Sequence, residues 1–261
     1  MKINVYQIDA FANKPFEGNP AAICPLGEWL SDELMQAIAT ENNLSETAFF
    51  VPNDDGYDLR GFTPSIEVDL CGHATLAAAY VLFEELDYEG DEIRFSTRSG
   101  GLSVVRNGDA LRMDFPAQPP VPYELPTQLV EALGTMPEDC LKFADIIAVL
   151  PSEELVRTAD PDMSLLEQLD CRGVIITAEA RDYDFVARWF GPRTGIKEDP
   201  VTGSAFTQLV PYWANRLGVN RLEAKQVSRR GGEVSCELAG DRVLISGKAV
   251  MYMRGIIEIE D

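Results

Sequence analysis

The chain has 261 residues, enough for one large domain or two of ordinary size, and 46% of them are hydrophobic, which is typical of a soluble globular protein. With 43 acidic against 22 basic side chains the formal charge is −21, so nucleic acid and anionic membrane surfaces would be repelled. No apolar run reaches the roughly 18 residues that a membrane-spanning helix needs, and the N-terminus alternates like a strand rather than like a signal peptide. We therefore expect a cytoplasmic protein.

Strands alternate with helices through the first part of the chain. Apolar and alternating runs predict strands at 2–10, 21–24, 47–51 and 57–64, and three more between 92 and 115. Ser31 is the expected N-cap of a helix that ends at 42. A polar, glycine-containing turn followed by strong helix formers predicts a second helix at 74–86. The prolines between 115 and 126 predict a linker.

A similar order of elements returns beyond the linker. The sequence predicts a strand at 146–150, helices at 152–157 and 163–169, strands at 173–177 and 183–190, and then a turn and a helix. Pro211 lies inside that helix and should kink or restart it. A meander of strands follows. The fold class is α+β.

Residue identity supports an internal repeat. Arg60, Phe62 and Pro64 lie 128 positions before Arg188, Phe190 and Pro192, and each trio precedes an acidic turn and a glycine. The second turn carries a three-residue insertion. We interpret the chain as a duplication, with a site between the copies.

The turns that precede the two related helices are candidate binding sites. Gly72 and His73 in the first half stand opposite Gly203 and Ser204 in the second, and free N–H groups at a helix N-terminus attract anions. A lone histidine is more often structural, but one at such a turn is positioned to meet a ligand. Asp199, before the second turn, is equally compatible with a cap and with a functional carboxylate.

Glu46 is a candidate acid or base. It stands at the mouth of an otherwise apolar strand, where aromatic neighbours would favour its protonated form and suit it to proton transfer. Its counterpart at the spacing of 128 is Val174. A solvated glutamate at a strand end is the alternative.

Motifs narrow the function further. The chain lacks a G-x-G-x-x-G between strand and helix, a G-x-x-x-x-G-K-[ST] and a G-x-S-x-G, which argues against nucleotide-binding and serine-hydrolase sites. With one histidine the common zinc sites cannot be assembled, so we expect no metal. Five cysteines at wide spacings fit no disulfide framework, and most should be buried, reduced thiols.

Four blocks carry a resemblance to a known family. They are "DAFANKPFEGNPAAIC", "NNLSETAFF", "GFTPSIEVDLCGHATLAAA" and "EDPVTGSAF", and they resemble the signature blocks of the PhzF-like (phenazine biosynthesis) isomerase family. The resemblance implies the diaminopimelate-epimerase fold, with two pseudo-symmetric domains, each a curved or barrel-like mixed sheet around a central helix. It places residues 1–117 in one half-repeat, which a C-terminal strand at 250–261 could complete, and residues 118–249 in the other.

The resemblance also assigns roles. Glu46, His73 and Asp199 match the family's catalytic residues, and Asn19, Gly72, Gly203 and Ser204 match residues that face the substrate. It implies no cofactor, a homodimer, and an isomerase that moves a proton on a small carboxylate-bearing metabolite.

Two alternatives stay open. The same fold hosts epimerases that use paired thiols, and Cys71 occupies the place of the first thiol. The corresponding residue in the second half is Thr202, which cannot act as a comparable acid or base, so a two-thiol mechanism is disfavoured. A dehydratase or epimerase with one thiol remains possible, as does a protein that only binds an anionic metabolite.

Overall fold

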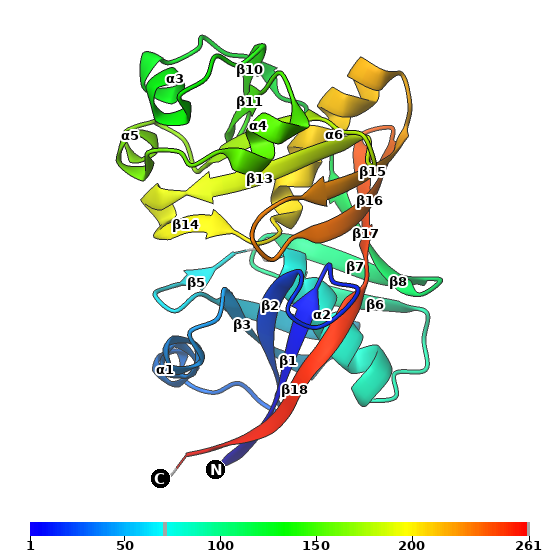
Figure 1. The fold of residues 1–261 in the computed structure, drawn as a ribbon. Helices are drawn as coiled ribbons and strands as arrows, with labels where there is room; N and C mark the ends of the chain where they lie inside the picture. The colour runs from blue at the N-terminus through cyan, green and yellow to red at the C-terminus, as the bar shows by residue number, and fades with distance from the viewer. Residues whose placement is uncertain (70–71, 260–261) are drawn as a thin grey trace. The chain divides into compact units, whose positions relative to one another are not determined.

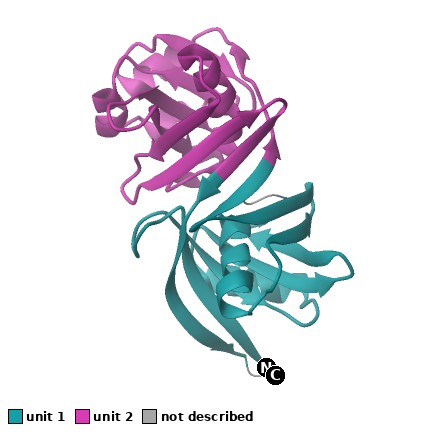
Figure 2. Ribbon diagram, turned by 90° about the vertical axis from the view of Figure 1, so that its right-hand side faces the viewer, with its two compact units in different colours: residues 1–114, 246–261 teal, residues 115–245 magenta. Residues whose placement is uncertain are grey.

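The computed structural model describes residues 1–69 and 72–259, which divide into two compact units (Figure 1 and Figure 2). Unit 1 consists of residues 1–114 and 246–261, and unit 2 of residues 115–245. No helix in these described ranges is long and apolar enough to cross a membrane.

Unit 1 is a mixed sheet around one long helix. Its elements are β1 (Lys2–Ala10), β2 (Asn19–Pro25), α1 (Asp32–Asn42), β3 (Glu46–Asn53), β4 (Gly56–Phe62), β5 (Glu67–Val68), α2 (Gly72–Glu85), β6 (Glu92–Thr97), β7 (Gly100–Asn107), β8 (Ala110–Pro116) and β18 (Ala249–Glu258). The strands pair in the order β18, β1, β2, β3, β4, β6, β7, β8. The β2–β3 and β4–β6 pairs are parallel and the others are antiparallel.

The helix α2 forms the inner core of unit 1. Ten of its 14 residues are buried, as expected for a helix that is apolar on all sides and contacts β1, β2, β3, β7 and β18. Amphipathic α1 covers the outer face of the sheet, where Met35 and Ile38 pack against alternate residues of β2 and β3 such as Cys24 and Phe49. The expected N-cap of α1 is confirmed, because Ser31 Oγ accepts a hydrogen bond from Leu34 N at 3.2 Å.

Unit 2 repeats this plan. Its elements are β9 (Val121–Pro122), α3 (Thr127–Leu133), β10 (Asp139–Lys142), β11 (Ile146–Val149), α4 (Glu153–Thr158), α5 (Met163–Glu167), β12 (Val174–Glu179), β13 (Phe185–Gly191), a 3-10 turn (Pro192–Thr194), β14 (Ile196–Asp199), α6 (Gly203–Leu217), β15 (Arg221–Gln226), β16 (Gly232–Ala239) and β17 (Arg242–Gly247). Strands β9, β10, β11, β12, β13, β15 and β16 pair in that order, with β11–β12 and β13–β15 parallel. Helices α3, α4 and α5 cover the outer face, and α6 packs on the inner one through Trp213, which donates to Thr177 Oγ1 at 3.0 Å.

An equivalent ion pair marks the repeat in each unit. Arg60 donates from Nε and Nη2 to the carboxylate of Glu67 at 2.7 and 2.8 Å. Arg188 binds Glu198 in the same way at 2.7 and 3.1 Å. The partners are 7 residues apart in unit 1 and 10 in unit 2, so the expected three-residue insertion falls between Arg188 and Glu198.

The second central helix runs without a break through Pro211, so the expectation of a restart was wrong. Proline cannot donate to the carbonyl four residues earlier, which belongs to Thr207. That carbonyl instead accepts the backbone N–H of Gln118 at 2.9 Å. A chain segment outside the helix thus supplies the missing hydrogen bond.

Candidate active site

The N-terminus of α2 carries a buried pair of polar side chains. Asn19 Nδ2 lies 3.2 Å from His73 Nδ1, and the two residues are 0% and 6% exposed. Because an amide nitrogen can only donate, Nδ1 is the acceptor and the ring proton is on Nε2. Burial lowers the pKa of His73 to about 3, so the imidazole is neutral at physiological pH and offers a hydrogen-bond donor rather than a cation.

Glu46 lies on the same face of the sheet as Asn19. It is the first residue of β3 and pairs with Ala21 of the parallel neighbour β2, two residues after Asn19. Phe49 points to the outer face of the sheet, where it packs with residues of α1. Because side chains alternate along a strand, Glu46, three positions earlier, points to the opposite, inner face that packs on α2. Its Oε2 atom is buried. The structure therefore places Asn19, Glu46 and His73 at one end of unit 1.

Backbone strain gathers in the loop that leads to Asn19. Phe11 and Phe16 have positive φ angles of 58° and 76°, which bulky residues rarely adopt. Asp9, 2% exposed, accepts a hydrogen bond from the backbone N–H of Phe16 at 2.8 Å and holds the loop. A Cβ at Gly18 would lie 2.1 Å from Ala10 O, so this position requires glycine. These constraints fix the conformation of the loop that leads to Asn19 and its partner His73.

Asp199, Gly203 and Ser204 lie in unit 2, at the start of α6. Asp199 is 8% exposed, and its Oδ2 accepts a hydrogen bond from Thr202 Oγ1 at 2.6 Å. The amide of Gln226 holds the same turn, donating to Asp199 O at 2.7 Å and accepting from Thr202 N at 2.9 Å. Ser204 is the second residue of the helix.

Arg172 was not among the residues predicted from the sequence, and it donates from Nη1 to Ser204 Oγ at 3.0 Å. Arg172 is held in turn by Asp145, a buried carboxylate just before β11. The signal was present, because Asp145 precedes an apolar strand in the same way that Glu46 does.

Strand register corrects the expected counterpart of Glu46. Phe62 pairs with Thr47, whereas the equivalent Phe190 pairs with Val174. Val174 is thus the counterpart of Thr47, and the residue matching Glu46 is Gly173. The spacing of 128 misplaced it by one residue because the hairpin that joins β12 to β13 is longer than its equivalent in unit 1.

The candidate residues form two groups. Asn19, Glu46, Gly72 and His73 belong to unit 1, and Asp199, Gly203 and Ser204 to unit 2. That the two groups face one cleft stays a prediction. Cys71, the alternative catalytic residue, lies outside the described residues.

The four described cysteines are free thiols with raised pKa values. Burial raises the pKa of Cys24 to about 12 and that of Cys140 to about 11, and it also raises the pKa values of Cys171 and Cys236. A thiol acts as a nucleophile or base through its thiolate, which the raised pKa values of these four cysteines disfavour at neutral pH. Within the described ranges, no three His, Cys, Asp or Glu side chains cluster as metal ligands.

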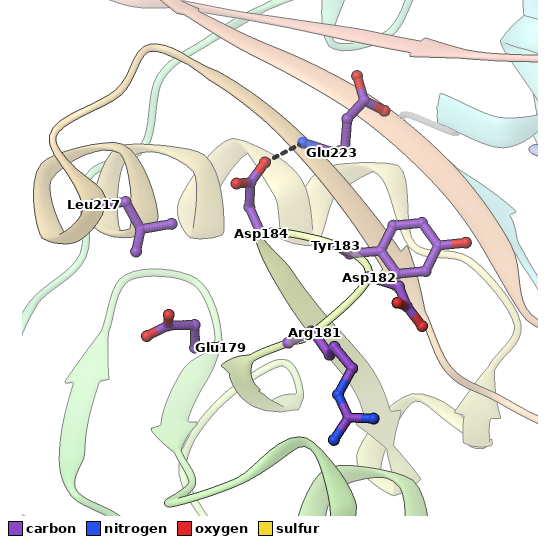
Figure 3. Close-up of a pocket in the computed structure, with 8 residues that line it drawn as sticks. Glu179, Arg181, Asp182, Tyr183, Asp184, Leu217 and Glu223 are labelled. Carbon is purple, nitrogen blue, oxygen red and sulfur yellow. Dashed lines mark hydrogen bonds between the residues drawn. The ribbon is translucent and has the colours of Figure 1, made fainter.

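A surface hollow of about 340 Å³ in unit 2 is a poor site for an anion (Figure 3). Four carboxylate residues contribute to its lining: Glu179, Asp182, Asp184 and Glu223. Arg181 is the only cation in the lining. Asp184 accepts the backbone N–H of Glu223 at 2.7 Å, which ties the hollow to β15.

Residues 8–255 match the family model described as phenazine biosynthesis-like protein. An uncharacterized isomerase of Pseudomonas aeruginosa is 55% identical over 259 residues, which cover 99% of this chain and 100% of that protein. A crystal structure of a PhzF-family phenazine biosynthesis protein from Enterococcus faecalis has a TM-score of 0.97 and 44% identity, covering 99% of this chain and 100% of that chain.

A hydroxyproline epimerase from Agrobacterium vitis shares the fold at 12% identity, with a TM-score of 0.66 over 100% of this chain and 93% of that chain. These comparisons confirm the expected α+β fold of two pseudo-symmetric domains of the diaminopimelate-epimerase type.

Proposed function

The chain belongs to the phenazine biosynthesis-like (PhzF) isomerase family, and we propose that it moves a proton on a small carboxylate-bearing metabolite without a cofactor, with Glu46 as general acid and base. One observation carries the proposal. Asn19 and His73, 54 positions apart in the chain, are hydrogen-bonded at the N-terminus of α2, and Glu46 lies on the same inner face of the sheet.

The geometry suits proton abstraction next to a carboxylate. A carboxylate base at Glu46 would take the proton, and the positive end of the helix dipole at the start of α2 would stabilise the negative charge that develops. The neutral His73 adds its Nε2–H as a donor without contributing a permanent positive charge. Glu46 then returns the proton to a different carbon, which completes an isomerisation.

Asp199, Gly203 and Ser204 are assigned to the same substrate through the family resemblance. Gly203 and Ser204 open α6, so their backbone N–H groups are free for a second polar group of the substrate. Asp199 is assigned to proton transfer or to orienting the substrate, and Thr202 fixes its carboxylate.

Deuterium exchange tests the proposal. The protein is incubated in D2O with a panel of small unsaturated carboxylates and carboxylates that bear an α-proton, and deuterium incorporation is followed by NMR. Glu46→Gln should abolish the exchange, because an amide can neither accept nor return the proton. Glu92→Gln makes the same chemical change at an exposed side chain, the first residue of β6, and as the control it should keep the parent rate.

Cys71→Ser separates the thiol alternative. Serine keeps the size of the side chain but not its acidity, so the exchange should persist. If Cys71→Ser lost the deuterium exchange while Glu46→Gln retained it, the assignment of Glu46 would be overturned and a single-thiol dehydratase or epimerase would be favoured. Binding without exchange in the parent protein would identify a metabolite-binding protein.

A further inference from the structure

Arg172 forms a fixed ion pair beside the N-terminus of α6. Its Nε donates to Asp145 Oδ1 at 2.9 Å, and its Nη2 donates to Oδ2 of the same carboxylate. The Asp145 side chain is 0% exposed, whereas that of Arg172 is 39% exposed. The pair therefore joins a buried acid to a cation that reaches solvent.

Gln208 of α6 binds both the side chain and the backbone N–H of Asp145. The Gln208 amide donates to Asp145 Oδ2 at 2.7 Å and accepts from Asp145 N at 3.1 Å, and Gln208 is fully buried. A buried carboxylate loses its hydration, and an ion pair seldom recovers that loss in full. The arrangement contributes little net stability, but it fixes the direction of the Arg172 guanidinium.

The free edge of the guanidinium faces the start of α6. Nη1 donates to Ser204 Oγ at 3.0 Å, which leaves the serine hydroxyl able to donate its own proton. A guanidinium has five N–H bonds, and the contacts with Asp145 and Ser204 use three. Among the described residues no acceptor meets the other two. A planar carboxylate matches the geometry of such an edge and can accept both N–H groups.

Trp189 adds a second unused donor. The Arg172 Cζ lies 5.7 Å from the centre of the indole ring, and Trp189 is only 4% exposed. Its Nε1 is buried and meets no acceptor within the described part of the chain. A buried donor without an acceptor is unfavourable, because it has lost its hydration with no hydrogen bond in return. A Cβ at Gly173 would lie 2.8 Å from Nε1, so the indole edge occupies the space beside Gly173, the residue that follows Arg172.

The internal repeat places these donors where unit 1 has its candidate base. Gly173 is the counterpart of Glu46, and Ser204 is the counterpart of His73. At the equivalent place unit 1 carries a carboxylate, whereas unit 2 carries a guanidinium, a hydroxyl and an indole N–H. In a chain of charge −21, this local group of donors can bind an anion that the overall field repels.

We propose that Arg172 is a specificity-determining residue that binds a carboxylate group of the substrate at the N-terminus of α6, with Asp145 as its positioning residue. This inference rests on the proposed isomerase function and names the group that selects the substrate. The enzyme then prefers metabolites whose carboxylate can accept from Arg172 and from Ser204 Oγ over their neutral amides.

NMR titration of the full chain tests the proposal with succinate as the probe and succinamide as its neutral analogue, in a buffer free of carboxylate and phosphate. Two side-chain signals report on the site: the Nε–H of Arg172, assigned by its loss in Arg172→Lys, and the indole N–H of Trp189, assigned with Trp189→Phe. Succinate should shift both signals in a saturable way, and succinamide should shift neither.

Three variants decide the outcome. Arg172→Gln should weaken succinate binding, followed at the Trp189 signal, by about tenfold or more, as expected for loss of a charge-assisted hydrogen bond. The double variant Arg172→Gln/Asp145→Asn avoids an unpaired buried charge and should show the same loss. Arg157→Gln removes an exposed arginine that pairs with Glu153 and should bind as the parent does.

Parent-like succinate binding in the double variant would overturn the proposal, as would the absence of a succinate response at Arg172 in the parent. Neither result needs turnover. Loss of the Glu46 assignment in the deuterium experiment would leave the binding result standing, and failure of the binding test would leave the proton-transfer assignment untouched.

Discussion

The protonation of His73 is set by its surroundings at the start of α2. Burial lowers its pKa to about 3, and Asn19 donates to Nδ1, so both effects favour the neutral imidazole with its proton on Nε2. A neutral ring of this kind can donate a hydrogen bond to developing negative charge, which agrees with the proposal that a carboxylate, Glu46, abstracts the proton.

His73 is the only histidine in the chain, so its titration can be followed without assignment. We expect its C2–H resonance to show no titration between pH 8 and pH 5. A midpoint near the usual value of about 6.5 would contradict the neutral assignment.

The same shift makes stability depend on pH. The pKa of His73 is lower in the folded state than in the unfolded state, so the unfolded state takes up the proton first as the pH falls. The contribution of neutral His73 to stability is therefore complete above about pH 6.5 and is lost as the pH falls towards 3. Between pH 6.5 and pH 5 the free energy of unfolding should fall by about 1.5 kcal/mol relative to His73→Gln. Urea unfolding of both proteins measures the difference.

The candidate site was only partly predictable from the sequence. Glu46, His73 and Ser204 each stand in a short stretch whose secondary structure depends on adjacent residues. Their placement at a strand start or a helix start could therefore be inferred. Arg172 was missed because its contact with Ser204 spans 32 positions and depends on how β12 lies beside α6. The counterpart of Glu46 was misplaced because register is set by hairpin length, which a fixed spacing ignores.

Two equivalent ion pairs join β4 to β5 and β13 to β14, but their surroundings differ. Glu67 also binds Arg98 at 2.7 Å, whereas the one cation that contacts Glu198 among the described residues is Arg188. Arg188 Nη1 donates further to the carbonyls of Val156 and Ala159 at 3.2 and 2.6 Å. The pair in unit 2 thus holds more of its surroundings together.

Arg188→Gln should therefore destabilise the protein by about 3 kcal/mol, since it strands a partly buried carboxylate and two carbonyls. Arg60→Gln should cost about 1 kcal/mol, because Arg98 still pairs with Glu67. Denaturant unfolding of the two variants compares them directly, and the reverse order of stability would show that the contacts of Arg188 do not stabilise the fold as described.

Helices and strands were easier to predict than the long-range hydrogen bonds that stabilise them. The apolar alternation and the Ser31 cap are local signals, and the elements formed where these signals lay. The uninterrupted course of α6 was not predictable, because the N–H group that replaces that of the proline belongs to Gln118. Gln118 lies 89 positions before Thr207, and the side chains of these two residues are hydrogen-bonded as well. Local rules describe the cost of a proline but not its compensation.

The net charge of −21 acts on the molecule as a whole. Like charges on one compact chain repel, and added salt screens them, with a Debye length that falls from about 30 Å at 0.01 M to about 8 Å at 0.15 M. The melting temperature should therefore rise by several degrees over this range of sodium chloride. Choline chloride, measured in parallel, should give the same rise, and a rise with sodium alone would indicate specific ion binding instead of screening.

The pairing of β1 with β18 has a consequence for synthesis on the ribosome. Lys2 of β1 pairs with Glu258 of β18, so the sheet of unit 1 needs a strand that is made after all of unit 2. Unit 2 is continuous in sequence and can fold as soon as residue 245 has left the exit tunnel. Until β18 follows, β1 lacks its partner on one side, and such an unpaired strand edge can pair with another chain. The domain that begins first is thus the one that is finished last.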